Sequence, residues 1–180
     1  MGWVRDKYGR RWLELYCPVA FREIWPLPLA RMWTDQYPHI FRRDDLEYTV
    51  SYNEDGRKYH LVEWFAAICL FHLYGASILF KRYAYGPERW KLKKLEQIVG
   101  ESGVTFLRTG LGGFPPDLLL YHNHTSRFWF AEVKGPSDRL HKRQEEDFAR
   151  ICERFRFRTK VELVRVRFLQ PERSTLLSLE

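Results

Sequence analysis

The most constraining feature of the sequence is a pair of strongly apolar stretches in its second half. Residues 117–121 and 127–134 are rich in leucine and aromatic residues, and the polar residues 123–126 separate them. Short apolar runs bounded by turn-forming residues are typical of buried β-strands. The pattern over residues 138–155 predicts an amphipathic helix, and the alternation over residues 161–169 predicts a further strand. We therefore expect an α/β fold with a central mixed β-sheet flanked by α-helices.

Further elements are predicted before these strands. Residues 61–74 are apolar almost all round and end at a glycine, which predicts a buried helix. Residues 77–84 have the composition of a strand, and residues 88–99 that of a more polar helix. The composition of residues 46–60, which include an Asn-Glu-Asp-Gly turn, predicts a β-hairpin. A short strand is predicted at residues 104–107.

The N-terminal part, residues 1–55, is expected to form an aromatic-rich extension. It shows no clear period up to about residue 45, and it holds four of the seven tryptophans. This pattern predicts short helices and turns packed on the main body. An alternative is a clamp for nucleic acid, built from aromatic rings and arginines. The arginines in question are Arg10, Arg11, Arg42 and Arg43. Packing is the favoured interpretation.

The charge and the cysteines narrow the class of protein. Lysine and arginine number 30 against 23 acidic residues, so the net charge is +7, which favours a polyanionic partner or a merely soluble basic surface. Three widely separated cysteines predict neither a disulfide framework nor a zinc site. The charged N-terminus does not resemble a signal peptide, and the apolar residues 64–80 fit a helix followed by a strand better than a membrane span. We expect an intracellular protein with no membrane partner.

Three charged residues stand at the ends of the two central strands. Asp117 follows two prolines, while Glu132 and Lys134 close the second strand and point to the same face. Burying unpaired charges there would cost several kcal/mol each, whereas a divalent cation would stabilise the carboxylates. The pattern favours a metal site centred on Asp117, Glu132 and Lys134. A buried ion pair between Glu132 and Lys134 is the simpler alternative.

The helix predicted after these strands carries a polar residue on its apolar face. Gln144 lies four residues after Leu140 and four before Phe148, so it should face the core. A buried amide must be hydrogen-bonded. Gln144 would therefore hold the lysine, a water or a phosphate, or else be a satisfied core residue. The same helix carries cations that would contact phosphates or form a solvated face. These cations are Arg139, Lys142, Arg143 and Arg150.

One further carboxylate is unusual in its surroundings. Glu63 is the only acidic residue of the apolar helix predicted over residues 61–74. A buried acid needs a partner, which would be either the N-terminal end of its own helix or a shared metal ion. We favour the metal. Glu96 is the rival helix carboxylate, but it lies among lysines, so a solvated charge is its expected role.

Together these residues resemble a known family. Pro116-Asp117, the sequence EVKGPSDRL at residues 132–140, and the following Gln144 are similar to the motifs of the VRR-NUC branch of the PD-(D/E)xK nucleases. The resemblance covers about residues 60–169. It implies a restriction-endonuclease-like core and a nuclease domain over residues 56–180. The N-terminal extension would then pack on this domain or clamp beside it.

The resemblance also implies roles for single residues. Asp117 and Glu132 would bind the metal, with the Val133 carbonyl oxygen as a further ligand and Glu63 as the helix glutamate. Lys134 would position or activate the attacking water. Gln144 matches the helix glutamine of the family. The implied cofactor is Mg²⁺, for which Mn²⁺ can substitute.

The implied function is hydrolysis of phosphodiester bonds in DNA. Structured substrates such as junctions, flaps or other branched DNA are expected, in repair, recombination or replication. A homodimer would suit a two-fold junction. Three alternatives stay open at this point: a nucleic-acid-binding module with an inactive core, an RNA endonuclease of the same superfamily, and a protein that acts on no nucleic acid and holds these charges in a buried salt-bridge network.

Overall fold

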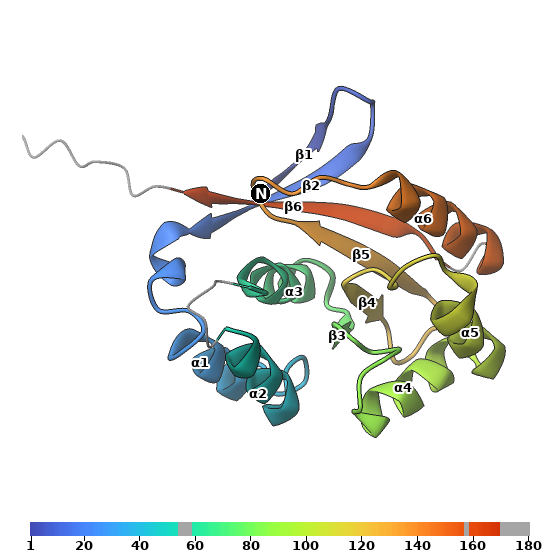
Figure 1. Cartoon of the computed structure of the whole chain (residues 1–180), viewed down its shortest axis with the longest axis horizontal. Helices are drawn as coiled ribbons and strands as arrows, with labels where there is room; N and C mark the ends of the chain where they lie inside the picture. The colour runs from blue at the N-terminus through green and yellow to red at the C-terminus, as the bar shows by residue number, and fades with distance from the viewer. Residues whose placement is uncertain (54–58, 157–158, 170–180) are drawn as a thin grey trace, which may run out of the picture.

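A computed structural model describes residues 1–53, 59–156 and 159–169. Its centre is a six-stranded mixed sheet with the strand order β1-β2-β6-β5-β4-β3 (Figure 1). The pairs β2–β6 and β5–β6 are parallel, and the others are antiparallel. The strands are β1 (Gly2–Arg5), β2 (Arg11–Pro18), β3 (Ser77–Phe80), β4 (Leu118–Tyr121), β5 (Phe128–Lys134) and β6 (Val161–Leu169). The predicted α/β class is confirmed, and the sheet is consistent with a restriction-endonuclease-like core.

Helices cover both faces of this sheet. Leu118 and Leu120 belong to the core beneath α3, while Leu119 belongs to the core beneath α6. This split arises because successive side chains of a strand point to opposite faces. The helices are α1 (Leu29–Gln36), α2 (Arg43–Tyr52), α3 (Leu61–Tyr74), α4 (Arg89–Val99), α5 (Glu101–Thr105) and α6 (Lys142–Arg154), with short turns η1 (Val19–Arg22) and η2 (Phe106–Gly110).

The face covered by α3 has an aromatic core that the N-terminal segment helps to build. The ring of Trp64 on α3 is fully buried and stacks on Phe41, with 3.8 Å between ring centroids. Trp25 and Trp33 pack against the same ring at 5.7 Å and 6.5 Å. These tryptophans therefore act as core residues, as the packing interpretation predicts.

The first strands differ from the irregular structure expected up to about residue 45. β1 and β2 form an antiparallel hairpin at the edge of the sheet, and β2 pairs in parallel with β6, with Trp12 opposite Leu163. The expectation was wrong here because β2 is covered on both faces. Trp12, Leu13 and Leu15 are all buried, so the sequence shows no alternation. Short helices and turns follow between Val19 and Gln36, as expected.

The hairpin predicted over residues 46–60 is wrong in its first arm, which lies in helix α2. The helix starts where the Asp45 carboxylate accepts the Arg42 backbone N–H at 3.0 Å. Thr49 is fully buried against α3, and its hydroxyl accepts a hydrogen bond from Trp64 Nε1 at 3.1 Å. Packing on α3 thus overrides a strand-like composition. The turn predicted within that range lies largely outside the described residues.

The short strand predicted at residues 104–107 is helical instead. The end of α5 and the start of η2 occupy this stretch. Val104 and Leu107 are three residues apart and both enter the core shared with α6. Helical spacing explains this burial, and a short apolar run does not by itself distinguish a strand from a buried helix.

Two predicted elements are shorter than expected. β3 ends at Phe80, although a strand was predicted over residues 77–84, and α6 begins at Lys142 rather than at Asp138. Asp138 instead forms a turn in which its carboxylate accepts the Gly135 N–H at 2.9 Å. The chain segments that follow β3 and precede α6 line the cavity described next.

Candidate active site

A cavity of about 730 Å³ lies where the end of β3, the start of β4 and the end of β5 meet the N-terminal ends of α3 and α6. We refer to it as the sheet-edge cavity. Its lining includes Glu63, Asp117, Glu132, Val133, Lys134 and Gln144. The structure therefore brings together the residues that the sequence proposed for catalysis and for metal binding.

Strand pairing sets three charged residues side by side. The last residue of β3 pairs with the first residue of β4, which pairs in turn with Ala131 of β5. One step further along this ladder, Lys81, Asp117 and Glu132 come into line across the three strands. The Lys81 N–H donates to the Asp117 carbonyl at 3.0 Å, and the Val133 N–H donates to Asp117 Oδ2 at 2.9 Å. These two hydrogen bonds, one to its carbonyl and one to its carboxylate, hold Asp117 at the sheet edge.

On the α6 side of the sheet, two cavity residues hold Glu132. Lys134 Nζ lies 2.7 Å from Glu132 Oε1, and the Gln144 amide donates to the same oxygen at 2.6 Å. Burial, together with the negative charge of Asp117, raises the pKa of Glu132 from an ordinary 4.5 to about 7, although Lys134 and Gln144 oppose this rise. Glu132 would therefore be stabilised by any further positive charge.

On the other side of Asp117, an ammonium group bridges two carboxylates. Lys81 Nζ lies 2.7 Å from Glu63 Oε1 and 3.1 Å from Asp117 Oδ1, and it lies 3.3 Å from His60 Nδ1. Burial alone would raise the pKa of Glu63, but Lys81 and His60 hold that pKa well below its ordinary value. Burial alone would lower the pKa of Lys81, but Asp117 and Glu63 raise it. Glu63 and Lys81 are therefore charged at neutral pH.

The donor set suits a hard divalent cation. Carboxylate oxygens of the kind that Glu63, Asp117 and Glu132 supply are preferred ligands of Mg²⁺ and Mn²⁺. Glu63 Oε2 is buried and has no hydrogen-bond partner within the described ranges, so it is available as a ligand. Among the residues that the structure describes, no three His, Cys, Asp or Glu side chains already group around one point as metal ligands. A cation at Glu63 and Asp117 would therefore replace Lys81 Nζ as their partner.

The cations predicted to contact phosphates fall into separate places. Arg143 lines the sheet-edge cavity. Arg139 and Lys142 line a second cavity, which shares Asp138 with the first. Arg150 is half-exposed and lies 3.7 Å from a carboxylate of its own helix. The rival carboxylate Glu96 is exposed on α4 and does not line the sheet-edge cavity.

Sequence reasoning missed Lys81 and His60. For Lys81 there was a signal, because it directly follows an apolar strand, as Asp117 precedes one. His60 gave no such signal: its position depends on a left-handed backbone, with φ 68°, just before α3 and on stacking against Tyr48 at 5.5 Å. The contacts that bring Lys81 and His60 into the site are tertiary, so no local period in the sequence reveals them.

Comparison with known protein families decides the classification. The family model of the VRR-NUC domain matches residues 89–168. These residues are a VRR-NUC domain. The family predicted from the sequence is thereby confirmed, and membership of the PD-(D/E)xK nuclease superfamily follows from it. No curated protein matches the chain.

The VRR-NUC domain accounts for part of the site. It contains Asp117, Glu132, Lys134 and Gln144, whereas Glu63 comes from the chain before the matched residues. The domain implies a nuclease-type function and therefore a nucleic-acid substrate. None of the helices in the described ranges is both long and apolar enough to cross a membrane.

Proposed function

We propose that this protein is a metal-dependent endonuclease that hydrolyses phosphodiester bonds in branched DNA, such as junctions and flaps. The supporting observation is that Asp117, Glu132 and Lys134 of the VRR-NUC domain converge with Glu63 on one cavity. A net charge of +7 suits a polyanionic substrate. Such an activity would serve DNA repair, recombination or replication inside the cell.

The cofactor of this proposal is Mg²⁺, with Mn²⁺ as a substitute. Asp117, Glu132, Glu63 and the Val133 carbonyl oxygen would hold it. The bound ion would lower the pKa of a water and neutralise charge that develops on the phosphate. Gln144 fixes one oxygen of Glu132 at 2.6 Å, which limits rotation of the carboxylate.

Lys134 and Arg143 supply the positive charge that the chain itself contributes. The Lys134 ammonium is held 2.7 Å from Glu132 Oε1, so it can donate to a phosphate oxygen or orient a water in the cavity. Arg143 lines the same cavity in the first turn of α6. The backbone N–H groups of a helix N-terminus also favour a phosphate. The scissile phosphate would therefore lie between the end of β5 and the start of α6.

The test is a cleavage assay with junction, flap, blunt-duplex and matched RNA substrates in Mg²⁺, Mn²⁺ or EDTA. Asp117→Asn and Glu132→Gln should each lower the rate by at least about 100-fold, because each removes charge from the reacting centre. Glu96→Gln is the matched control, since Glu96 is an exposed carboxylate outside the cavity. It should cut like the wild type.

The same assay separates the alternatives. If the wild type and Asp117→Asn are equally inert while both bind DNA, the chain is a binding module and the nuclease proposal is wrong. Faster cutting of RNA than of matched DNA would make it an RNA endonuclease. Equal rates on branched and blunt-duplex DNA would refute selection of branched substrates.

A further inference from the structure

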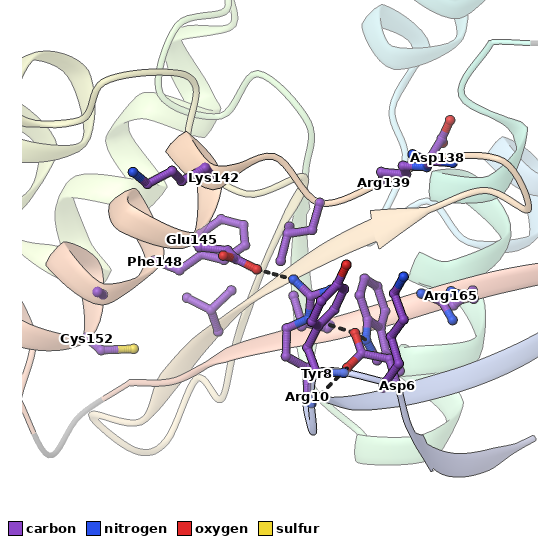
Figure 2. Close-up of a pocket in the computed structure, with 16 residues that line it drawn as sticks. Asp6, Tyr8, Arg10, Asp138, Arg139, Lys142, Glu145, Phe148, Cys152 and Arg165 are labelled. Carbon is purple, nitrogen blue, oxygen red and sulfur yellow. Dashed lines mark hydrogen bonds and ion pairs between the residues drawn. The ribbon is translucent and has the colours of Figure 1, made fainter.

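A second cavity lies between the β1–β2 hairpin and α6 (Figure 2). We refer to it as the hairpin cavity. Its volume of about 1090 Å³ is slightly above the range of roughly 300–1,000 Å³ that is typical of sites for one small molecule. Asp138 lines both this cavity and the sheet-edge cavity. The two cavities are therefore neighbours.

Positive charge predominates along the hairpin cavity. Its cationic side chains are Lys7, Arg10, Arg139, Lys142 and Arg165, against the three carboxylates of Asp6, Asp138 and Glu145. Each of these carboxylates already has a partner within the protein: Arg10 pairs with Asp6 and with Glu145, and Asp138 accepts a backbone N–H. Lys142 lies 3.7 Å from a neighbouring glutamate, but both side chains are exposed and such a pair is weak. The cations other than Arg10 are therefore available to bind a row of phosphates.

The hairpin tip also presents an aromatic ring to solvent. Tyr8 is 69% exposed, and Lys7 Nζ and the Arg10 guanidinium lie 5.0 Å and 4.7 Å from its ring centroid. An exposed ring flanked by cations is the combination that binds single-stranded nucleic acid, because bases stack on the ring while cations meet the phosphates. The bases of an intact duplex already stack on each other, so this ring favours an unpaired strand.

The tip is held in a fixed shape and tied to α6. Asp6 Oδ1 accepts the N–H groups of Tyr8 and Arg10 at 2.9 Å and 3.0 Å, and Gly9 closes the turn with φ 79°. The Arg10 side chain lies between Asp6, at 2.7 Å, and Glu145 of α6, with which it forms a second ion pair (Figure 2). Tyr8 is therefore presented at a defined place beside the helix that holds Gln144.

We infer that the hairpin cavity holds a single-stranded nucleic-acid arm continuous with the strand being cut. Tyr8 stacks on a base of this arm, and Lys7 and Arg139 contact its phosphates. The inference rests on the proposed nuclease function and adds the place on this chain that binds the unpaired arm of such a substrate. The Tyr8 ring and its flanking cations come from residues before the VRR-NUC domain, so this aromatic and basic tip is not part of the matched domain.

The test measures binding of the full-length chain by fluorescence anisotropy in EDTA, so that no cutting occurs. The probes are blunt DNA duplex and the same duplex with a DNA arm or an RNA arm. Tyr8→Ala should weaken binding of the arm-carrying duplex by about 5- to 100-fold, the loss expected for one stacked base. Tyr8→Phe, which keeps the ring, should bind like the wild type. Blunt duplex should bind Tyr8→Ala and the wild type equally.

Salt dependence tests the phosphate contacts separately. Lys7→Gln and Arg139→Gln should each reduce the slope of log affinity against log salt by about 0.7 for the arm-carrying duplex. Tyr16→Ala and Lys93→Gln are matched controls, because both residues are exposed and neither lines the hairpin cavity. They should leave the affinity and the slope unchanged.

The inference is overturned if Tyr8→Ala binds the arm-carrying duplex like the wild type. It is also overturned if Tyr8→Ala loses affinity for blunt duplex by the same factor as for the arm-carrying duplex. Loss confined to the armed probes supports it, and the tighter of the two arms identifies the strand as DNA or RNA. If the protein cuts DNA while Tyr8→Ala binds normally, only this inference fails. If it cuts nothing but Tyr8→Ala loses arm binding, only the nuclease proposal fails.

Discussion

Replacing Glu132 with glutamine should make the metal-free protein more stable above neutral pH, even though it removes an active-site charge. The pKa of Glu132 is about 7 in the folded protein against an ordinary 4.5, because burial and Asp117 disfavour the charged form. A tenfold change in an ionisation equilibrium corresponds to about 1.4 kcal/mol. The charged carboxylate therefore lowers the free energy of unfolding by about 3 kcal/mol at high pH. Glutamine resembles the protonated side chain and avoids this loss.

The effect has a defined pH window. Between about pH 4.5 and about pH 7 the folded protein binds more protons than the unfolded chain at Glu132, so wild-type stability falls as pH rises through this window. Relative to wild type, Glu132→Gln should gain about 1 kcal/mol near pH 5 and about 3 kcal/mol near pH 8. Below the window both states are protonated and the difference disappears.

The assay is urea unfolding in EDTA at these two pH values. In a thermal melt the gain near pH 8 corresponds to roughly 6–12 °C for a domain of this size. Glu14→Gln is a control of opposite sign, because Arg167 holds the pKa of Glu14 below its ordinary value. That variant should lose stability above the ordinary pKa, and the loss should shrink as pH falls through the folded pKa. Added Mg²⁺ should stabilise the wild type by mass action and have less effect on Glu132→Gln.

One result would refute this reasoning. If Glu132→Gln is no more stable than the wild type near pH 8, or if its gain is the same near pH 5, the charge of Glu132 is fully compensated in the metal-free fold. The cavity would then have no uncompensated negative charge to attract a cation, although its geometry would be unchanged.

Three further predictions concern the core and the orientation of the site. Asp45→Ala should lower the free energy of unfolding by about 3–5 kcal/mol, because it removes the side-chain acceptor of both the buried Lys91 ammonium and the Arg42 N–H, and a second change, Lys91→Met, should restore much of the loss in urea unfolding. Trp64→Ala should cost about 3–5 kcal/mol in the same assay, since its ring is the centre of the α3 core, and a loss under about 1 kcal/mol would contradict that role. Gln144→Leu should lower the cleavage rate by about 10- to 100-fold with little change in melting temperature, because Glu132 loses a donor; an unchanged rate would make the amide dispensable.

Much of the site was predictable because its signals are local. Asp117 directly precedes β4 and Glu132 lies near the end of β5. These strands are neighbours in the chain and pair as an antiparallel hairpin, so the approach of the two residues follows from strand geometry. Gln144 was predictable from helical spacing, and it meets Glu132 as a core-facing amide should. The metal assignment to these residues stays a prediction.

Other contacts depend on parts of the chain that are far apart. Glu63, in the first turn of α3, meets Lys81, which follows the end of β3, and neither residue indicates the other by spacing. The composition of residues 46–52 indicated a strand, but burial of Thr49 against α3 makes it a helix. Local propensity is weak compared with burial of a complementary face, so such segments are decided by packing.

The sequence by itself determined the α/β class, the buried strands β4 and β5, and the cluster of Asp117, Glu132 and Lys134. Apolar runs bounded by turn residues and the helical period of residues 138–155 are local features that can be recognised without the fold. Only the tertiary structure decided that residues 2–5 and 11–18 complete the sheet beside β6 and carry a basic, aromatic tip to α6. The parallel pairing of β2 with β6 leaves no local period in the sequence, because the paired residues lie about 150 positions apart.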